Sequence, residues 1–222
     1  KDRDGITLEE ATRRVGVDIM RAKDAGKQLR NAKAYLELHI EQGPVLESMG
    51  LPLGAVLGTF GVERHAVNFT GQAAHSGSTP MDKRRDALGG VSKLHLEIRE
   101  IAKRHGGVCT VGRVETKPGI VTSVVAHARM TLDQRHLDAD KLAAMYADAQ
   151  DASRRFAQEE GIEVEWEYIW RIEPILFHPD LIEMCDQSVL ETAGASHRLP
   201  SGPLHDAAEV ARAGIPTIMM FV

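Results

Sequence analysis

A short segment near the start of the chain places a histidine between glutamates on one face of an apolar strand. Residues 34–40 alternate, so that the leucines and Ile40 point one way while Glu37, His39 and Glu41 point the other. Gly43 and Pro44 then end the strand. Imidazole beside carboxylates is a typical donor set for a divalent cation. The pattern favours His39 as a metal ligand, although a half-buried strand with a solvated polar face has the same alternation.

Two more of the ten histidines lie in segments of small and turn-forming residues. His75 lies in the stretch Ala-Ala-His-Ser-Gly-Ser-Thr-Pro, and His205 follows Ser-Gly-Pro-Leu. The backbone of such segments can approach a ligand closely. The other seven histidines occupy positions where a solvated or core histidine is commoner than a ligand. His75 and His205 are therefore candidates for chemistry, with the alternative that His75 only orders its turn.

Arg135 and Gln42 are candidates for binding a small polar substrate. The guanidinium of Arg135 offers two parallel donors that match the two oxygens of a carboxylate. The alternative for Arg135 is a salt bridge to Asp133 or Asp138. Gln42 follows His39 by three residues, and its alternative role is to cap free backbone amides at the end of the strand.

Composition excludes several classes of protein. With 222 residues, 43% of them hydrophobic and 27% charged, the chain can form a substantial core. The 27 basic and 32 acidic side chains include no dense basic run, so nucleic acid is not an expected partner. We expect no membrane partner, because no apolar run approaches the ~20 residues that span a bilayer. Two unpatterned cysteines and an N-terminus unlike a signal peptide predict a cytoplasmic location.

The order of elements predicts an α/β fold whose middle part is an α+β insertion. A capping box at residues 7–10 opens a helix, and a charged connector at residues 21–33 leads to the His39 strand. The middle of the chain then reads β-α-β-β-α-β. This order is that of a ferredoxin-like sandwich, with two helices on one face of an antiparallel sheet. Its expected elements are strand 63–70, helix 84–105, strands 108–115 and 120–135, helix 139–160 and strand 162–170.

The ends of the chain are expected to belong to one split domain. Pro174 and Pro179 mark the end of the insertion, and a helix at 180–193 and a buried strand at 215–222 follow. The predicted division is therefore residues 1–60, 61–172 and 173–222.

Taken together, these motifs resemble one family. The segments His-Ile-Glu-Gln-Gly, Ala-His-Ser-Gly-Ser-Thr-Pro-Met, Asp-Gln-Arg-His and His-Asp-Ala occur in order along the chain. They are similar to those of the metal-dependent N-carbamoyl-L-amino-acid hydrolases and allantoate amidohydrolases of the M20 group. The resemblance implies a di-metal amidohydrolase that cleaves the C–N bond of a carbamoyl or ureido group on a small carboxylate substrate. It also implies a split catalytic domain interrupted by a lid, and a homodimer formed through that lid.

The resemblance assigns roles residue by residue. His39 corresponds to a ligand of one of two divalent ions, for which Zn²⁺, Mn²⁺ and Co²⁺ all remain open. His75 corresponds to the catalytic lid histidine that donates a hydrogen bond to the carbonyl oxygen as it becomes an oxyanion. Gln42, Arg135 and His205 correspond to substrate-binding residues, with Arg135 at the carboxylate.

The chain also departs from the family pattern. Thr122 stands where the family has a substrate-binding asparagine, and Pro203-Leu204 replaces the Gly-Ala that usually leads into the His205 motif. Thr122 can donate one hydrogen bond but cannot reproduce the paired contacts of an amide. The family's other metal ligands would lie outside residues 1–222, so we expect this chain alone to be inactive. An aminoacylase or dipeptidase of the same group, or a non-catalytic dimerisation or binding module, are the alternative functions.

Overall fold

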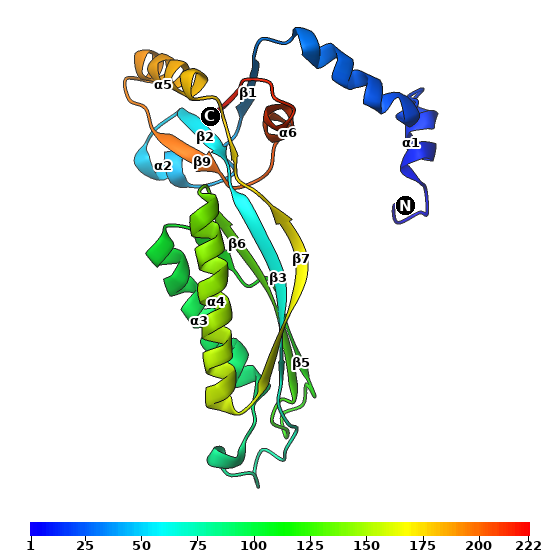
Figure 1. The fold of residues 1–222 in the computed structure, drawn as a ribbon, viewed down its shortest axis with the longest axis vertical. Coiled ribbons are helices and arrows are strands. Elements are labelled where there is room, and N and C mark those ends of the chain that lie inside the picture. Colours follow the sequence, from blue (N-terminus) through cyan, green and yellow to red (C-terminus); the bar gives the residue numbers. More distant parts are fainter.

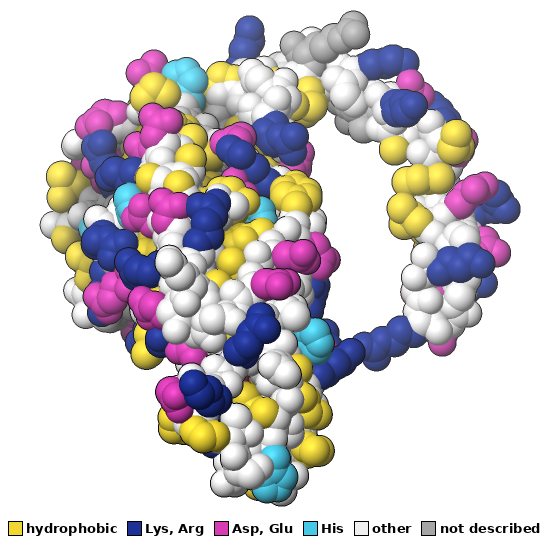
Figure 2. Space-filling model, turned by 60° about the horizontal axis from the view of Figure 1, so that its bottom comes forward, with side chains coloured by type: hydrophobic (Ala, Val, Ile, Leu, Met, Phe, Trp, Pro, Cys, Tyr) yellow, Lys and Arg dark blue, Asp and Glu magenta, His cyan; other side chains and the backbone are white. Residues whose placement is uncertain are grey.

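The structure is a computed structural model that describes the backbone of residues 1–222 and all side chains except those of residues 25, 28 and 30. It is a mixed α/β fold with two five-stranded sheets, which follow one another along the long axis of the molecule (Figure 1). Among the described residues, no helix combines the length and apolar character needed to cross a bilayer. On the face of the molecule shown in Figure 2, basic and acidic side chains are interspersed with hydrophobic ones.

The first sheet joins the two ends of the chain. Its order is β1-β10-β2-β8, with β9 also paired to β2, and β1 and β10 run parallel. Val56, Met219 and Phe221 form part of its buried core. The strands are β1 (Tyr35–His39), β2 (Gly54–Thr59), β8 (Ile175–Leu176), β9 (Arg198–Ser201) and β10 (Thr217–Phe221). Three helices flank them: α2 (Val45–Met49), α5 (Pro179–Ala193) and α6 (Asp206–Arg212).

The helix and strand expected after Pro174 are present as α5 and β10. The sequence analysis missed α2, α6 and β9, which are short and carry no strong periodicity. Because β1 pairs with β10 and β2 pairs with β8, segments from both ends of the chain share one sheet. The division into residues 1–60, 61–172 and 173–222 stays a prediction.

The second sheet has the order β4-β6-β3-β7, with β5 paired to β6. Two long helices cover one of its faces (Figure 1). This is the expected β-α-β-β-α-β arrangement with one additional short strand, and we call it the sandwich. Its elements are β3 (Gly61–Thr70), α3 (Ala87–His105), β4 (Val108–Thr110), β5 (Val114–Lys117), β6 (His127–His136), α4 (Ala139–Glu160) and β7 (Glu163–Ile172).

Alternation along the strands separates a buried face of the sandwich from an open one. On β6, Met130 and Leu132 lie in the core beneath the helices, where they pack with Leu94, Ile98 and Met145. The residues between them therefore project from the face that the helices leave open. That open face carries Arg135.

Several boundaries differ from the expected ones. Helix α3 begins at Ala87 because Asp86 caps it, its carboxylate accepting from the amide of Leu88 at 3.0 Å. The segment expected as a strand from residue 120 enters the sheet only at His127. The charged connector is a 3₁₀ helix, Ile19–Asn31, whose first turn is capped by Asp18. The capping box at residues 7–10 is confirmed at the start of α1 (Leu8–Arg14).

Candidate active site

His39 lies on the polar face of edge strand β1. The alternation is as expected: Leu36 and Leu38 are 74% and 64% exposed on one face, while Glu37 and His39 are half-buried on the other. The Nδ1 atom of His39 lies 2.8 Å from the carbonyl oxygen of Ile40. Because a carbonyl can only accept, Nδ1 must carry the proton, and the lone pair of Nε2 is free for a metal ion.

His205 lies beside His39, with ring centroids 4.4 Å apart. Its Nε2 is 2.7 Å from the hydroxyl of Ser201, which is also 3.0 Å from the carbonyl oxygen of Pro203. Ser201 has one proton, and the carbonyl of Pro203 can only accept it. His205 therefore donates from Nε2 to Ser201, and its Nδ1 lone pair is free. Burial, and secondly the proximity of His39, lower the pKa of His205, which favours this neutral form.

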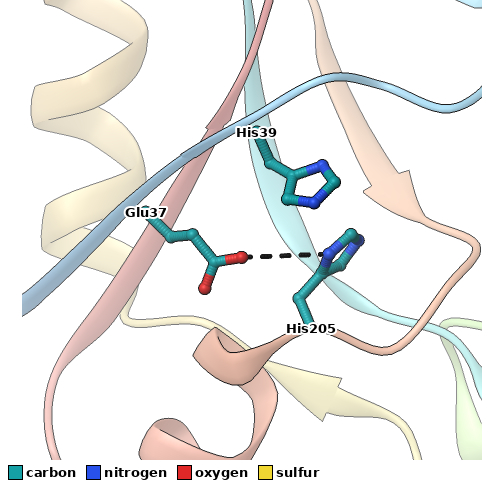
Figure 3. Close-up of side chains that lie close together, drawn as sticks. All are labelled: Glu37, His39 and His205. Carbon is teal, nitrogen blue, oxygen red and sulfur yellow. Dashed lines mark ion pairs between the residues drawn. The ribbon is translucent and has the colours of Figure 1, made fainter.

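Glu37 completes a cluster with the two histidines (Figure 3). Its Oε2 accepts from the amide of Ala207 at 2.8 Å and from the hydroxyl of Tyr35 at 3.2 Å. Its Oε1 lies 3.8 Å from Nδ1 of His205. The ligand atoms of Glu37, His39 and His205 all lie within 4.8 Å of one another, and such a donor set suits Zn²⁺, Mn²⁺ or Co²⁺. The sequence analysis did not select Glu37, although its spacing of two from His39 places both on one strand face.

Gln42 has an unusual backbone conformation directly after this strand. Its φ is +56°, in the left-handed region that residues other than glycine rarely adopt. Capping of free amides, the alternative role for Gln42, is performed by Glu41, whose carboxylate oxygens accept from the amides of Val45 and Leu46 at 2.7 Å each. Gln42 is exposed, and its amide makes no hydrogen bond to the described side chains or backbone. Backbone strain of this kind is often found at functional sites.

Arg135 forms the salt bridge that was its alternative role. It donates to both carboxylate oxygens of Asp133, from Nε at 2.6 Å and from Nη2 at 3.1 Å. Its Nη1 donates to the carbonyl oxygen of Gly202 at 2.9 Å, which joins the sandwich to the loop before His205. Arg64 donates from Nε to the same Asp133 at 2.5 Å. Two guanidinium groups thus share one carboxylate.

His75 and Thr122 lie together in loops of the sandwich. The amide of Ser76 donates to the carbonyl of Thr122 at 3.0 Å, and His75 forms an isolated bridge with Ser123. The amides of Gly77 and Ser78 donate to Nδ1 of His75 at 3.1 and 3.2 Å. His75 does order its turn, as its alternative role requires. The same contacts place its proton on Nε2, which remains a free donor.

The candidate residues fall into two groups within one chain. Strand β3 starts next to the first sheet and ends at the opposite end of the sandwich, near the loop of His75 (Figure 1). Ten strand residues span roughly 33 Å. Glu37, His39 and His205 gather at the first sheet, with Arg135 at the nearby end of the sandwich. His75 and Thr122 lie at its far end.

Comparison with known proteins identifies the family of this chain. The peptidase family M20/M25/M40 matches residues 6–222. This protein chain therefore belongs to that family.

Individual relatives are similar over the whole chain. It is 32% identical to an N-carbamoyl-L-amino acid amidohydrolase of Geobacillus stearothermophilus, covering 100% of this chain and 54% of the relative. It is also 32% identical to an allantoate amidohydrolase of Escherichia coli, with the same coverage. A crystal structure of a hydantoinase/carbamoylase family amidase from Burkholderia multivorans superposes with a TM-score of 0.89 at 35% identity, covering 100% of this chain and 53% of that one. The chain thus spans about half the length of these relatives.

Proposed function

We propose that this chain forms part of a di-metal amidohydrolase that cleaves the C–N bond of a carbamoyl or ureido group on a small carboxylate substrate. N-carbamoyl-L-amino acids and allantoate are the two substrate classes named among its relatives. The observation that carries the proposal is the convergence of Glu37, His39 and His205 on the polar face of the first sheet.

The free Nε2 of His39 fits the role of a metal ligand. The contact between Nδ1 and the carbonyl of Ile40 holds the ring and leaves the other nitrogen unprotonated. Divalent ions, when bound, lower the pKa of a water molecule and polarise the scissile carbonyl. His205, in the neutral form described above, presents a lone pair at the same place and can accept a hydrogen bond from the substrate.

His75 fits the role of a donor to the developing oxyanion. Two backbone amides occupy its Nδ1, so Nε2 carries the proton and can donate it in a hydrogen bond. Removal of such a donor typically costs ~3 kcal/mol of transition-state stabilisation. The carbonyl of Thr122 holds the same loop, and the Thr122 side chain is exposed beside it. It is a candidate for one hydrogen bond to substrate.

Arg135 fits a carboxylate of the substrate in spite of its salt bridge. A guanidinium has five N–H donors, of which Asp133 and Gly202 occupy three. Nη1 and Nη2 therefore each keep one N–H that these contacts do not use. Asp133 therefore orients Arg135 and leaves two N–H donors for a second carboxylate. Gln42, with its free amide, lies beside the His39 strand as a further substrate contact.

The separation of the two groups supports a homodimer. His75 lies about one strand length from His39, so the two side chains do not meet within this conformation of one chain. In the proposed dimer, the sandwich acts as a lid whose far end reaches the active site of the second subunit. Strand β7 is an edge of the second sheet and is available to pair with its symmetry mate.

The decisive experiment removes His39 from the whole protein that contains this chain. His39→Ala should lower the bound metal and abolish turnover of N-carbamoyl amino acids, while His95→Ala, on helix α3, should change neither. Metal content is measured by elemental analysis, which is independent of activity. A His39→Ala variant with undiminished metal and activity would contradict the proposal. A wild-type protein without metal or turnover would favour the non-catalytic module instead.

A further inference from the structure

A cavity of about 700 Å³ lies between the open face of the sandwich and the loop at Gly202 and Pro203. Strands β3, β4, β6 and β7 all contribute side chains to it. Its volume falls in the range of ~300–1,000 Å³ that is usual for small-molecule sites. It is large enough for the side chain of any amino acid.

One end of this cavity is positively charged. Arg64, Asp133 and Arg135 line it, and two guanidinium groups against one carboxylate leave a net charge of +1. Arg64 is held both by Asp133 and by the ring of Trp170, whose centroid lies 5.2 Å from its guanidinium carbon. The charged end is thus fixed in place.

The remaining wall is largely apolar. Phe60, Val108, Ile169 and Pro203 contribute to it, and Val108 and Ile169 are 49% and 43% exposed. Apart from the charged group, the only polar side chains among the described lining residues are threonines, at positions 110 and 131. A ligand that reaches from Arg135 along this wall would therefore combine a carboxylate with an apolar group.

We propose that this cavity receives the substrate side chain and selects N-carbamoyl amino acids with a large apolar side chain over allantoate. The inference rests on the proposed function, in which Arg135 binds the carboxylate. Allantoate carries two ureido groups on the carbon next to its carboxylate. With one of them at the metal centre, the other would enter this cavity. Each N–H and C=O that is buried there without a partner is unfavourable, whereas an isobutyl or benzyl group gains from burial.

Binding to the whole protein that contains this chain tests the selection, with His75→Ala introduced so that the ligands are not hydrolysed during the measurement. Calorimetry with N-carbamoyl-L-phenylalanine, N-carbamoylglycine and allantoate should give a dissociation constant for the first ligand about tenfold lower than for the other two. Allantoate or N-carbamoylglycine binding as tightly as N-carbamoyl-L-phenylalanine would overturn the inference. So would an absence of binding by all three ligands.

Matched variants test whether the cavity wall causes the difference in affinity. Val108→Thr places a hydroxyl in the wall of the cavity. It should weaken the binding of N-carbamoyl-L-phenylalanine about threefold and leave the binding of N-carbamoylglycine unchanged. Val114→Thr is the control, because Val114 is 45% exposed on a neighbouring strand outside the cavity lining. Equal effects of the two substitutions would overturn the inference.

Arg135→Ala distinguishes this inference from the proposed function. If it leaves the affinity for N-carbamoylglycine unchanged, the carboxylate contact of the proposed function fails, and the selection fails with it. If it weakens all three ligands equally while wild type binds them with equal affinity, the carboxylate contact stands and only the selection fails.

Discussion

At the scale of single residues, hydrogen bonds assign the protons of three histidines. His39 and His205 each direct a lone pair into the candidate metal site, because a carbonyl and a serine hydroxyl hold their protonated nitrogens. His75 has the opposite state, with a free Nε2–H, because two amides occupy its Nδ1. The first two can therefore accept a metal ion or proton, and the third can donate to an oxyanion.

Arg135→Lys tests the carboxylate contact in the whole protein. An ammonium cannot keep the bidentate bond to Asp133 and also offer paired donors to a second carboxylate. We therefore expect kcat/KM to fall roughly thirtyfold, which corresponds to a loss of about 2 kcal/mol of transition-state stabilisation, and KM to rise. Metal content should not change. The control is a substrate analogue with an amide in place of the carboxylate, for which wild type and variant should differ little. Equal losses on both substrates would show that Arg135 supports the fold instead.

At the scale of elements, a charged cluster joins α3 to α4. Asp148 on α4 accepts from His105 at 2.9 Å and from Arg104 at 3.3 Å. The contact with His105, followed by that with Arg104, holds the pKa of Asp148 below its ordinary value. Because the folded pKa is depressed, the ionised carboxylate stabilises the folded state above pH ~4, and this contribution is lost as the pH falls through the folded pKa.

Asp148→Asn should therefore lower the free energy of unfolding at pH 7 by about 0.5 kcal/mol, a modest value because the side chain is 39% exposed and screened. The difference from wild type should shrink as the pH is lowered below ~4. Urea unfolding at several pH values measures it. Asp151→Asn on the same helix is the control, because Asp151 pairs only with exposed Arg154 among the described side chains, and its effect should be smaller. A difference in unfolding free energy between Asp148→Asn and wild type that grows at low pH would contradict the lowered pKa of Asp148.

The loop that carries His75 begins at a position where only glycine fits. A Cβ at Gly71 would lie 2.0 Å from the carbonyl oxygen of Arg85, which also accepts from the amide of Gln72 at 2.9 Å. Gly71→Ala should destabilise the protein by ~1–3 kcal/mol through this overlap. Gly112→Ala, whose new Cβ meets nothing closer than 3.7 Å, should stay within about 0.5 kcal/mol of wild type. Thermal unfolding of both variants and the wild type measures the two changes in stability.

At the scale of the whole molecule, we expect residues 1–222 alone to hydrolyse no N-carbamoyl amino acid at a measurable rate. Glu37, His39 and His205 offer three ligand atoms, too few for a pair of metal ions together with a general base. The assay is made after chelation and re-addition of Mn²⁺, with the whole protein as the positive control. Turnover by the isolated chain would count against a di-metal mechanism.

The proposed dimer makes a separate prediction about subunit mixtures. In the whole protein, His39→Ala and His75→Ala should each be inactive. If the far end of the lid serves the second subunit, a mixed dimer regains one intact site, since it combines His39 of one subunit with His75 of the other. Refolding the two variants together should therefore recover about a quarter of the wild-type activity. No recovery, despite mixed dimers detected by mass spectrometry, would place both histidines in one subunit's site.

The sequence by itself determined the local features of this protein. The alternation around His39, the capping box at residues 7–10 and the order of elements in the sandwich were all predicted, because each depends on residues close together in the chain. Short elements with little periodicity, such as α6 and β9, were missed. Without the resemblance to a known family, neighbouring residues alone left His39, Gln42, His75 and Arg135 each with a plain alternative role.

Only the tertiary structure decided which of these residues meet. Glu37 and Ala207 are 170 positions apart, and they touch because β1 pairs with β10 and α6 lies beside them. Arg135 reaches Gly202 across 67 positions, while His75 remains about a strand length from His39. Such contacts depend on how sheets pair and cores pack over the whole chain, which the pattern of neighbouring residues does not specify. The separation of the candidate residues into two groups is therefore a property of the fold.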